Sequence, residues 1–189
     1  MDFQEDIANC LAVLAKGGLI AYPTDTIWGI GCDATDSKAV ERIYKLKQRT
    51  ESKSMIVLVA EARDLLRYTA ATDLELIDYL KNTEKPTTVI CPGAIGLAPN
   101  LLATDGSVGI RVTKELFTKT LIKRMRKPLV STSANVSGQP SPGNFAEIDE
   151  EIITNVDYVV KYRQDDREKH QPSAVVRWLG GGKVEVIRP

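Results

Sequence analysis

The stretch Met55-Ile56-Val57-Leu58-Val59-Ala60 is a near-continuous apolar run. A short run of this kind predicts a central strand that is buried on both faces of a sheet. Working outward, short apolar segments predict further strands at 19–22, 87–91, 108–112, 129–131 and 158–161, and a hairpin of 174–178 with 184–188. Helical spacing predicts helices at 2–16, 37–48, 115–126 and 145–154, with two short helices after residue 60. Because strands and helices alternate without strict order, we predict an α/β fold with a mixed sheet.

The composition is that of an ordinary globular chain. Its 189 residues are 43% hydrophobic and 26% charged, which predicts a single domain spanning residues 1–189. The 25 basic and 25 acidic residues balance, so the total charge does not indicate a strongly cationic nucleic-acid binder, although a local basic patch stays open. No apolar run reaches the roughly 18–20 residues that cross a bilayer, and the acidic N-terminus is unlike a signal peptide. We therefore expect a cytoplasmic protein with no membrane partner.

The cysteines and the histidine limit the chemistry. Cys10, Cys32 and Cys91 are an odd, widely spaced set, which argues against a disulfide framework and against a C-x-x-C zinc or redox site. His170 is the only histidine, so most Ser-His or Cys-His arrangements would have to use it. It lies in the charged stretch 163–171, and we interpret it as solvated. Any catalysis is therefore expected to rely on Lys, Arg, Ser, Thr and Asp.

Three polar stretches border the predicted strands, where α/β proteins place their ligands. The first, 22–31, is a proline turn with two threonines and an aspartate, suited to a small polar substrate; a solvated turn is the alternative. In the second, 45–53, Lys47 and Arg49 can face one anion if the segment is a loop; a solvated helix end is the alternative. The third, 131–141, can form an anion-binding nest of small hydroxyl residues, or else a serine-rich surface loop.

Two common nucleotide-binding motifs are not supported. Residues 29–34 match G-x-G-x-x-[GA], but a Pro-Thr loop separates them from the strand before and the helix starts later, so we reject a dinucleotide site. The sequence contains no G-x-x-x-x-G-K-[ST].

Arg111 is more informative, because a charge inside the predicted strand 108–112 either faces solvent or is paired, and a ligand carboxylate or phosphate is a natural partner. Arg188 ends the last strand in the same way.

Several short motifs follow one another along the chain. In sequence order they are Tyr22-Pro23-Thr24-Asp25-Thr26 with Gly29 and Gly31, Lys47-x-Arg49, Pro92-Gly93, Val108-Gly109-Ile110-Arg111-Val112, Ser131-Thr132-Ser133-Ala134-Asn135-x-Ser137-Gly138, Pro172-Ser173, and Ile187-Arg188-Pro189. Together they resemble the YrdC/Sua5 family over about residues 19–189, and the length resembles the short YrdC form.

This resemblance implies a YrdC-like twisted mixed β-sheet flanked by helices, with a concave basic surface. It also implies L-threonylcarbamoyladenylate synthase activity, which joins L-threonine, bicarbonate or CO2, and ATP into threonylcarbamoyl-AMP and pyrophosphate. The product feeds the N6-threonylcarbamoyl modification of tRNA adenosine 37, so the partners implied are downstream t6A transfer proteins. Mg2+ would accompany the ATP phosphates, and no protein-ligated metal is expected.

The resemblance also implies roles for individual residues. Lys47 and Arg49 would be catalytic and, with Lys53, would hold the triphosphate. Threonine would be bound by Thr26, Arg111, Ser133 and Ser173. ATP would be contacted by Arg49, Lys53, Ser107, Ser131, Asn135, Ser141 and Arg188, with Asn135 supporting the serine loop.

The sequence departs from the family pattern at three places. Leu58 stands where Sua5-type sequences carry a histidine near the threonine, Thr50 replaces a proline, and 82–92 lacks the usual Pro-Gly-Pro-x-T order. These departures leave open a YciO-like paralogue that does not carry out threonine-dependent synthesis.

An RNA-binding module is another alternative. The segment 111–127 has seven basic residues against one acid, which could bind tRNA or double-stranded RNA through its phosphates. A hydrogenase maturation factor with a YrdC-like domain is excluded, because its acylphosphatase and zinc-finger segments do not fit in 189 residues.

Overall fold

The computed structural model describes residues 3–48, 55–70 and 74–189. The helices are α1 (Gln4–Leu14), α2 (Ser37–Leu46), α3 (Leu74–Asn82), α4 (Leu116–Met125) and α5 (Glu150–Asn155), with short 3-10 helices η1 (Ala62–Arg67), η2 (Pro99–Leu101) and η3 (Phe145–Glu147). The strands are β1 (Ile20–Tyr22), β2 (Gly29–Gly31), β3 (Ile56–Val59), β4 (Thr87–Cys91), β5 (Val108–Val112), β6 (Leu129–Ser133), β7 (Tyr158–Val159), β8 (Ala174–Gly180) and β9 (Lys183–Arg188). Among the described residues these strands form one mixed sheet in the order β7-β1-β2-β6-β3-β5-β4-β8-β9.

The apolar run at 55–60 forms the middle of this sheet. β3 pairs antiparallel with β6 and parallel with β5, and Val57, Leu58 and Val59 are buried. The predictions of a buried central strand and of an α/β fold with a mixed sheet are therefore confirmed. A strand in this position needs apolar side chains on both faces, because helices or other chain segments cover both.

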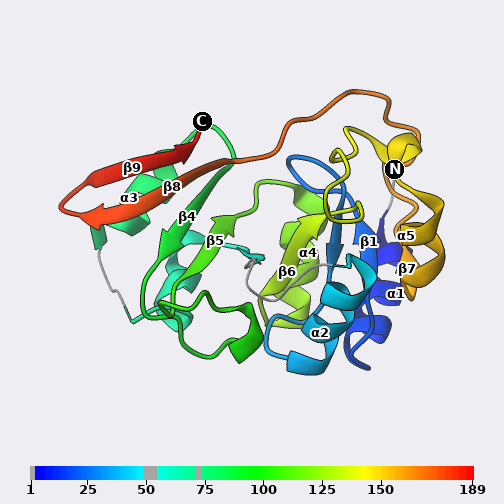
Figure 1. Ribbon diagram of the computed structural model, residues 1–189, viewed down its shortest axis with the longest axis horizontal. Coiled ribbons are helices and arrows are strands. Elements are labelled where there is room, and N and C mark those ends of the chain that lie inside the picture. The colour runs from blue at the N-terminus through cyan, green and yellow to red at the C-terminus, as the bar shows by residue number, and fades with distance from the viewer. Residues whose placement is uncertain (1–2, 49–54, 71–73) are drawn as a thin grey trace.

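The elements gather at two ends of the sheet (Figure 1). At one end, α1 and α5 lie beside β1 and β7, while at the other the β8–β9 hairpin lies beside α3. The chain between β7 and β8, drawn in orange, runs from the first end to the second across one rim of the molecule. This crossing segment matters for the site described below.

β2 was not expected from the sequence, where Gly29 and Gly31 were interpreted as part of a loop. A Cβ atom on Gly31 would lie 2.7 Å from both Val130 O and Tyr22 Cε1. The glycine is therefore required by the close approach of the neighbouring strands, and not by a turn. Because no side chain stands at Gly31, the Tyr22 hydroxyl can donate to Val130 O across β2.

Two other boundaries differ from expectation. The helix predicted at 145–154 is interrupted, because Asp149 caps α5 with its carboxylate, which accepts from Glu151 N at 2.8 Å. An aspartate that bonds its own following backbone favours a helix start over a helix interior. β6 runs on to Ser133, two residues beyond the predicted end, so Thr132 and Ser133 lie on the sheet and not in the following loop.

The three cysteines are buried free thiols. Burial raises the pKa of Cys91 to about 12 and also raises those of Cys10 and Cys32, so all three are neutral and weakly nucleophilic near pH 7. Within the described part of the chain, no helix has the length and apolar character that crossing a membrane would need.

The packing around β2 generates a stability prediction. Gly31→Ala should lower the free energy of unfolding by about 1–3 kcal/mol, because the new methyl meets a backbone carbonyl that cannot move away. The measurement is the thermal unfolding midpoint, where each kcal/mol corresponds to roughly 2–4 °C for a chain of this size. Gly143→Ala is the matched control, since its Cβ would meet only side-chain atoms of Glu147 and Lys169 at 3.3 Å or more. An equal midpoint for both variants would contradict the packing argument.

Candidate active site

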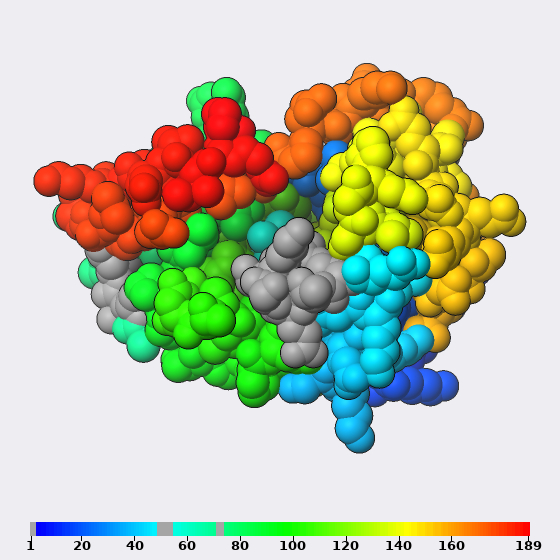
Figure 2. Space-filling view, viewed as in Figure 1, coloured from blue at the N-terminus to red at the C-terminus, as the bar shows by residue number. Residues whose placement is uncertain are grey.

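One face of the sheet forms the floor of a cavity. Side chains paired across a ladder share a face, and so do alternate residues of one strand. The register therefore puts the partners Gly29–Ser133, Ser131–Ile56, Ile56–Gly109, Arg111–Thr88 and Thr88–Val175 on one face. Small residues on this face leave space, and the cavity above it has a volume of about 250 Å³. Figure 2 shows the surface hollowed between the red C-terminal hairpin and the yellow segment that follows β6.

Most of the predicted site residues that the structure describes line this cavity. They are Thr26, Arg111, Ser131, Ser133, Ser141, Ser173 and Arg188. They come from separate parts of the chain, which the sheet brings together. Met55, Ile56 and Val175 add apolar wall that the motifs did not indicate. The arrangement is a polar pocket with hydroxyls and guanidinium groups, a donor set that suits carboxylate and phosphate oxygens.

The turn between β1 and β2 forms one wall through a compact set of hydrogen bonds. Thr24 Oγ1 accepts from Thr26 N at 3.0 Å, donates to Ile27 O at 2.8 Å and lies 2.9 Å from Thr26 Oγ1. Thr118 Oγ1, on α4, donates to Pro23 O at 3.0 Å. The turn is therefore held as a fixed structure, and Thr26 presents its hydroxyl to the cavity from a defined position.

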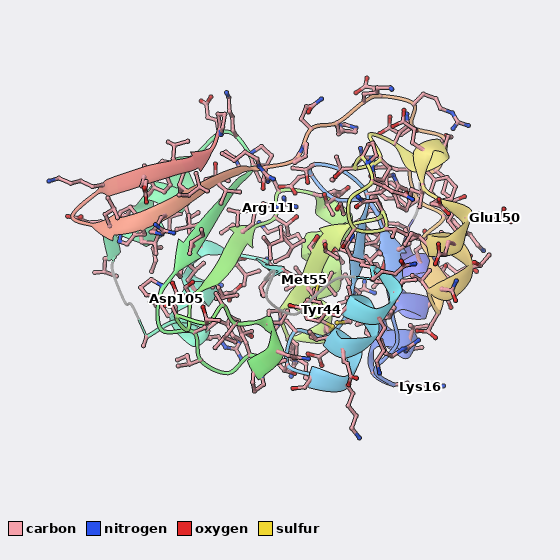
Figure 3. All side chains as sticks on the ribbon, viewed as in Figure 1. Lys16, Tyr44, Met55, Asp105, Arg111 and Glu150 are labelled. Atoms are coloured by element: carbon pink, nitrogen blue, oxygen red, sulfur yellow. The ribbon has the colours of Figure 1, made fainter. Side chains whose placement is uncertain are left out.

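Arg111 is the central charge of the site (Figure 3). Its side chain is 3% exposed and forms an ion pair with Asp25, whose Oδ1 lies 3.1 Å from Nη2. Asp25 is held in turn by Lys114 N, which donates to Oδ2 at 3.1 Å. Arg111 Nε is buried with no hydrogen-bond partner among the described residues. A buried donor without a partner is rare, and here it belongs to a residue on the cavity wall, so an anionic ligand group can complete it.

Lys47 supports the loop that follows β6. It is 1% exposed, and its ammonium donates to the carbonyls of Ser133 and Asn135 and, at 3.2 Å, to Asn135 Oδ1. Asn135 Nδ2 donates to Gln139 O at 2.6 Å, and Ser137 N donates to Lys47 O at 2.9 Å. The ammonium protons of Lys47 are directed to oxygens at the end of β6 and in the loop after it, and the expected contact of Lys47 with the triphosphate stays a prediction. The expected support of the loop by Asn135 agrees with these contacts.

The C-terminal hairpin closes a further side of the cavity. Ser173 Oγ lies 2.9 Å from Thr88 Oγ1, and Thr88 is the ladder partner of Arg111. Arg188 donates through Nε and Nη2 to the Ser173 carbonyl at 3.0 and 2.7 Å. Thr88 and Asp25 were not proposed as site residues, although Asp25 stands within a motif that was singled out. The sequence carried no signal for Thr88, because only the strand register shows its position.

The remaining predicted residues lie elsewhere. Ser107 precedes β5, at the end away from Arg111, where its hydroxyl donates to Asp105 at 2.6 Å; Figure 3 shows Asp105 well apart from Arg111. Ser107 and Asn135 do not appear among the described residues that line the cavity. Arg49 and Lys53 lie outside the described residues.

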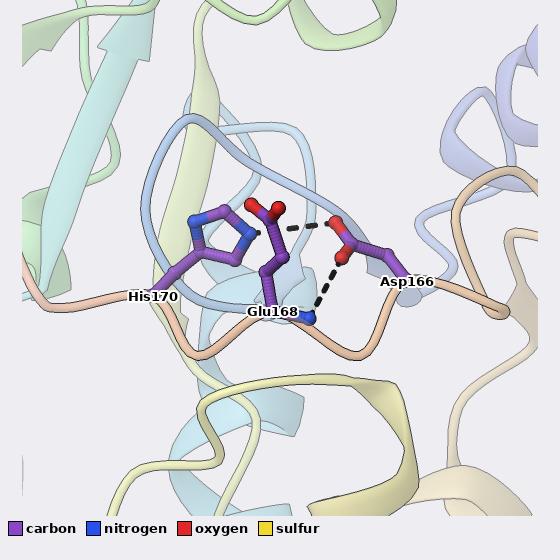
Figure 4. A group of neighbouring side chains, drawn as sticks. All are labelled: Asp166, Glu168 and His170. Carbon is purple, nitrogen blue, oxygen red and sulfur yellow. Dashed lines mark hydrogen bonds and ion pairs between the residues drawn. The ribbon is translucent and has the colours of Figure 1, made fainter.

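The segment 163–170 crosses above the turn at residues 23–26, and we name it the strap. Figure 4 shows Asp166, Glu168 and His170 gathered there. One carboxylate oxygen of each acidic residue and one ring nitrogen of His170 lie within 4.8 Å of one another. The interpretation of His170 as solvated was wrong: its side chain is 29% exposed, and Nε2 lies 3.1 Å from Arg163 Nη2 and 3.4 Å from Asp166. The Arg163 guanidinium, 2.7 Å from Asp166, helps to lower the pKa of that carboxyl to about 2. Because the Arg163 guanidinium already pairs with the Asp166 carboxylate, this cluster is a poor metal site.

Comparisons with known proteins identify the family. Residues 12–189 match the Sua5/YciO/YrdC family model, which is described as telomere recombination. The chain is 32% identical over 163 residues to threonylcarbamoyl-AMP synthase of Pseudoalteromonas translucida, and this match covers 85% of the chain and 87% of that protein.

Two solved structures share the fold. P. abyssi Sua5 complexed with L-threonine matches with a TM-score of 0.86 at 23% identity, over 98% of this chain and 54% of that chain, so this chain spans about half its length. E. coli YciO matches with a TM-score of 0.79 at 23% identity, over 98% of this chain and 89% of that chain. Because the family model matches nearly the whole length of this chain, the chain belongs to the Sua5/YciO/YrdC family.

Proposed function

We propose that this protein is an L-threonylcarbamoyladenylate synthase. The observation that carries the proposal is Arg111, a buried guanidinium on the wall of a hydroxyl-lined cavity, whose Nε has no partner among the described residues. Curated relatives that carry the name threonylcarbamoyl-AMP synthase match most of the chain. The reaction needs a site that binds an amino-acid carboxylate beside a nucleotide, and the cavity offers donors for both.

Threonine is proposed to bind at the Arg111 end. Its carboxylate accepts from Arg111, whose position is fixed by Asp25. The hydroxyls of Thr26, Ser133 and Ser173 surround the amine and the side-chain hydroxyl. Leu58, the ladder partner of Arg111 in β3, is fully buried, so it supplies apolar support and no hydrogen bond.

The chemical step is a nucleophilic attack by a carbamate. The threonine amine adds to CO2, loses a proton and becomes a carbamate. A carbamate oxygen then forms a bond to the α-phosphorus of ATP, and the bond from that phosphorus to the bridging oxygen breaks to release pyrophosphate. The protein contributes position and charge stabilisation, and no covalent intermediate is required.

ATP is proposed to bind along the loop that follows β6 and under the hairpin. Ser131, Ser141 and Arg188 line the cavity on that side. Arg49 and Lys53 are proposed to hold the triphosphate, Mg2+ to enter with the ATP phosphates, and Ser107 to act at a greater distance from the threonine end. Lys47 and Asn135 are proposed to act by shaping the loop.

The product is a mixed anhydride whose threonylcarbamoyl group must be transferred to an amine. We propose that this amine is the N6 amino group of adenosine 37 of tRNA, and that t6A transfer proteins carry out the transfer. We also propose that the reaction takes place in the cytoplasm and that residues 1–189 form one domain. A YciO-like or RNA-binding role is the alternative, and the assay below separates it from the synthase role.

The first prediction concerns substrate dependence. Purified protein with Mg-ATP should release pyrophosphate only when L-threonine and bicarbonate are both present, because the carbamate is the nucleophile. The measurement is a coupled pyrophosphate assay, with L-serine as the control substrate, and threonine should be preferred. Pyrophosphate release when both co-substrates are absent, or no release under any condition, would overturn the synthase proposal and favour the YciO-like alternative.

The second prediction concerns Arg111. Arg111→Ala should lower kcat/KM for threonine roughly 30-fold or more, because removing one partner of a buried charge pair costs about 2–5 kcal/mol. Arg111→Lys keeps the charge but loses the planar fork, and should recover only part of the activity. Arg177→Ala is the matched control, since Arg177 lies on β8 in an exposed pair with Glu185. Near-normal turnover by a folded Arg111→Ala protein would sink the threonine-site assignment.

A further inference from the structure

The strap is attached to two chain segments that lie next to residues of the cavity lining, Thr26 on one side and Ser141 on the other. Its first residue, Arg163, donates through Nη1 to the Thr24 carbonyl at 3.2 Å. At its other end, His170 N donates to the Gly143 carbonyl at 3.1 Å, and Lys169 pairs with Glu147 at 2.8 Å. The strap therefore connects the threonine-binding turn to the segment that follows the serine loop.

Arg163 is the residue that makes the first of these attachments. Its Nε and Nη2 donate to Asp166 Oδ2 at 3.2 and 2.7 Å, and Nη2 lies 3.1 Å from His170 Nε2. Because a guanidinium can only donate, His170 Nε2 acts as the acceptor in this contact. Asp166 and His170 thus leave Nη1 aimed at Thr24.

The backbone of Arg163 is in a conformation that residues other than glycine rarely adopt. Its φ is 64°, in the left-handed region. Such a conformation persists only when surrounding contacts determine it, and these residues tend to cluster at functional sites. The contacts to Asp166, His170 and Thr24 supply that determination.

Thr24 is held from two sides. Its carbonyl accepts from Arg163, while its hydroxyl orders Thr26 and Ile27 and lies 3.5 Å from Arg111 Nη2. Arg163 is absent from the described residues that line the cavity, so it does not contact a ligand there. Its effect on a ligand passes through Thr24.

We infer that Arg163 is a positioning residue for the threonine subsite, acting through its hydrogen bond to the Thr24 carbonyl. This inference rests on the proposed function, since it names the threonine end of that site. Losing the bond lets the turn at residues 23–26 rearrange, which misplaces Thr26 and loosens the surroundings of Arg111. The loop that follows β6 keeps its contacts with Lys47 and Asn135, none of which involves Arg163.

The test compares Michaelis constants. Arg163→Ala should raise KM for threonine about tenfold, as for the loss of a hydrogen bond to a charged group, while KM for ATP changes less than about twofold. Arg163→Lys, which restores one donor without the fork, should recover part of the loss. Arg167→Ala is the matched control, since its side chain is exposed on the same strap. Equal rises in both constants, or no change in either, would overturn the inference.

A second measurement does not depend on activity. Hydrogen exchange of the peptide containing residues 22–28 should quicken in Arg163→Ala and stay at the wild-type rate in Arg167→Ala. If the wild-type protein makes no threonine-dependent pyrophosphate, the proposed function fails, and this exchange experiment still reports on the attachment. Unchanged exchange in a folded Arg163→Ala protein would show that the strap does not hold the turn.

Discussion

The ion pair between Arg111 and Asp25 constrains the centre of this molecule. A guanidinium on a sheet face that is 3% exposed cannot stay unpaired, because an unpaired charge in such a place is expensive to desolvate. The turn between β1 and β2 must therefore bring Asp25 to β5, although β2, β6 and β3 lie between β1 and β5 in the sheet. The same turn carries Thr24 and Thr26, so pairing the charge also builds the wall of the cavity.

A second buried cation organises the opposite wall in a similar way. Lys47 places its ammonium among the carbonyls of Ser133 and Asn135, at the point where β6 ends. A buried ammonium needs acceptors for its protons, and one oxygen of Ser133 and two of Asn135 supply them. Both walls are thus shaped by cations that the fold has to satisfy. The apolar strands position these cations, and the cations in turn position the loops.

The sequence predicted those parts of the fold that depend on side-chain character. The apolar run at β3 and the short segments at β4 and β5 stand out because burial favours apolar side chains there. β2 was missed because a glycine strand has no side-chain pattern, and its cause lies in the closeness of Tyr22 and Val130. The site followed the same rule: Arg111 stood out as a charge inside a strand, whereas Thr88 owes its place to register alone. Lys47 was singled out from the sequence, but only the structure shows where its ammonium points.

The cavity also depends on what the sheet omits. Gly109 lies on the floor beside Ile56, and a Cβ there would approach Thr88 Cγ2 to 3.1 Å and Ile56 Cγ2 to 3.3 Å. Gly29 does the same beside Ser131, at 3.1 Å from its hydroxyl oxygen. Bare backbone at these two positions lets the side chains of Thr88, Ile56 and Ser131 lie close over the sheet, so these side chains and not the glycines form the surface above it. Two proteins with 23% identity to this chain and different names share its fold, so the fold alone does not identify what binds in the cavity.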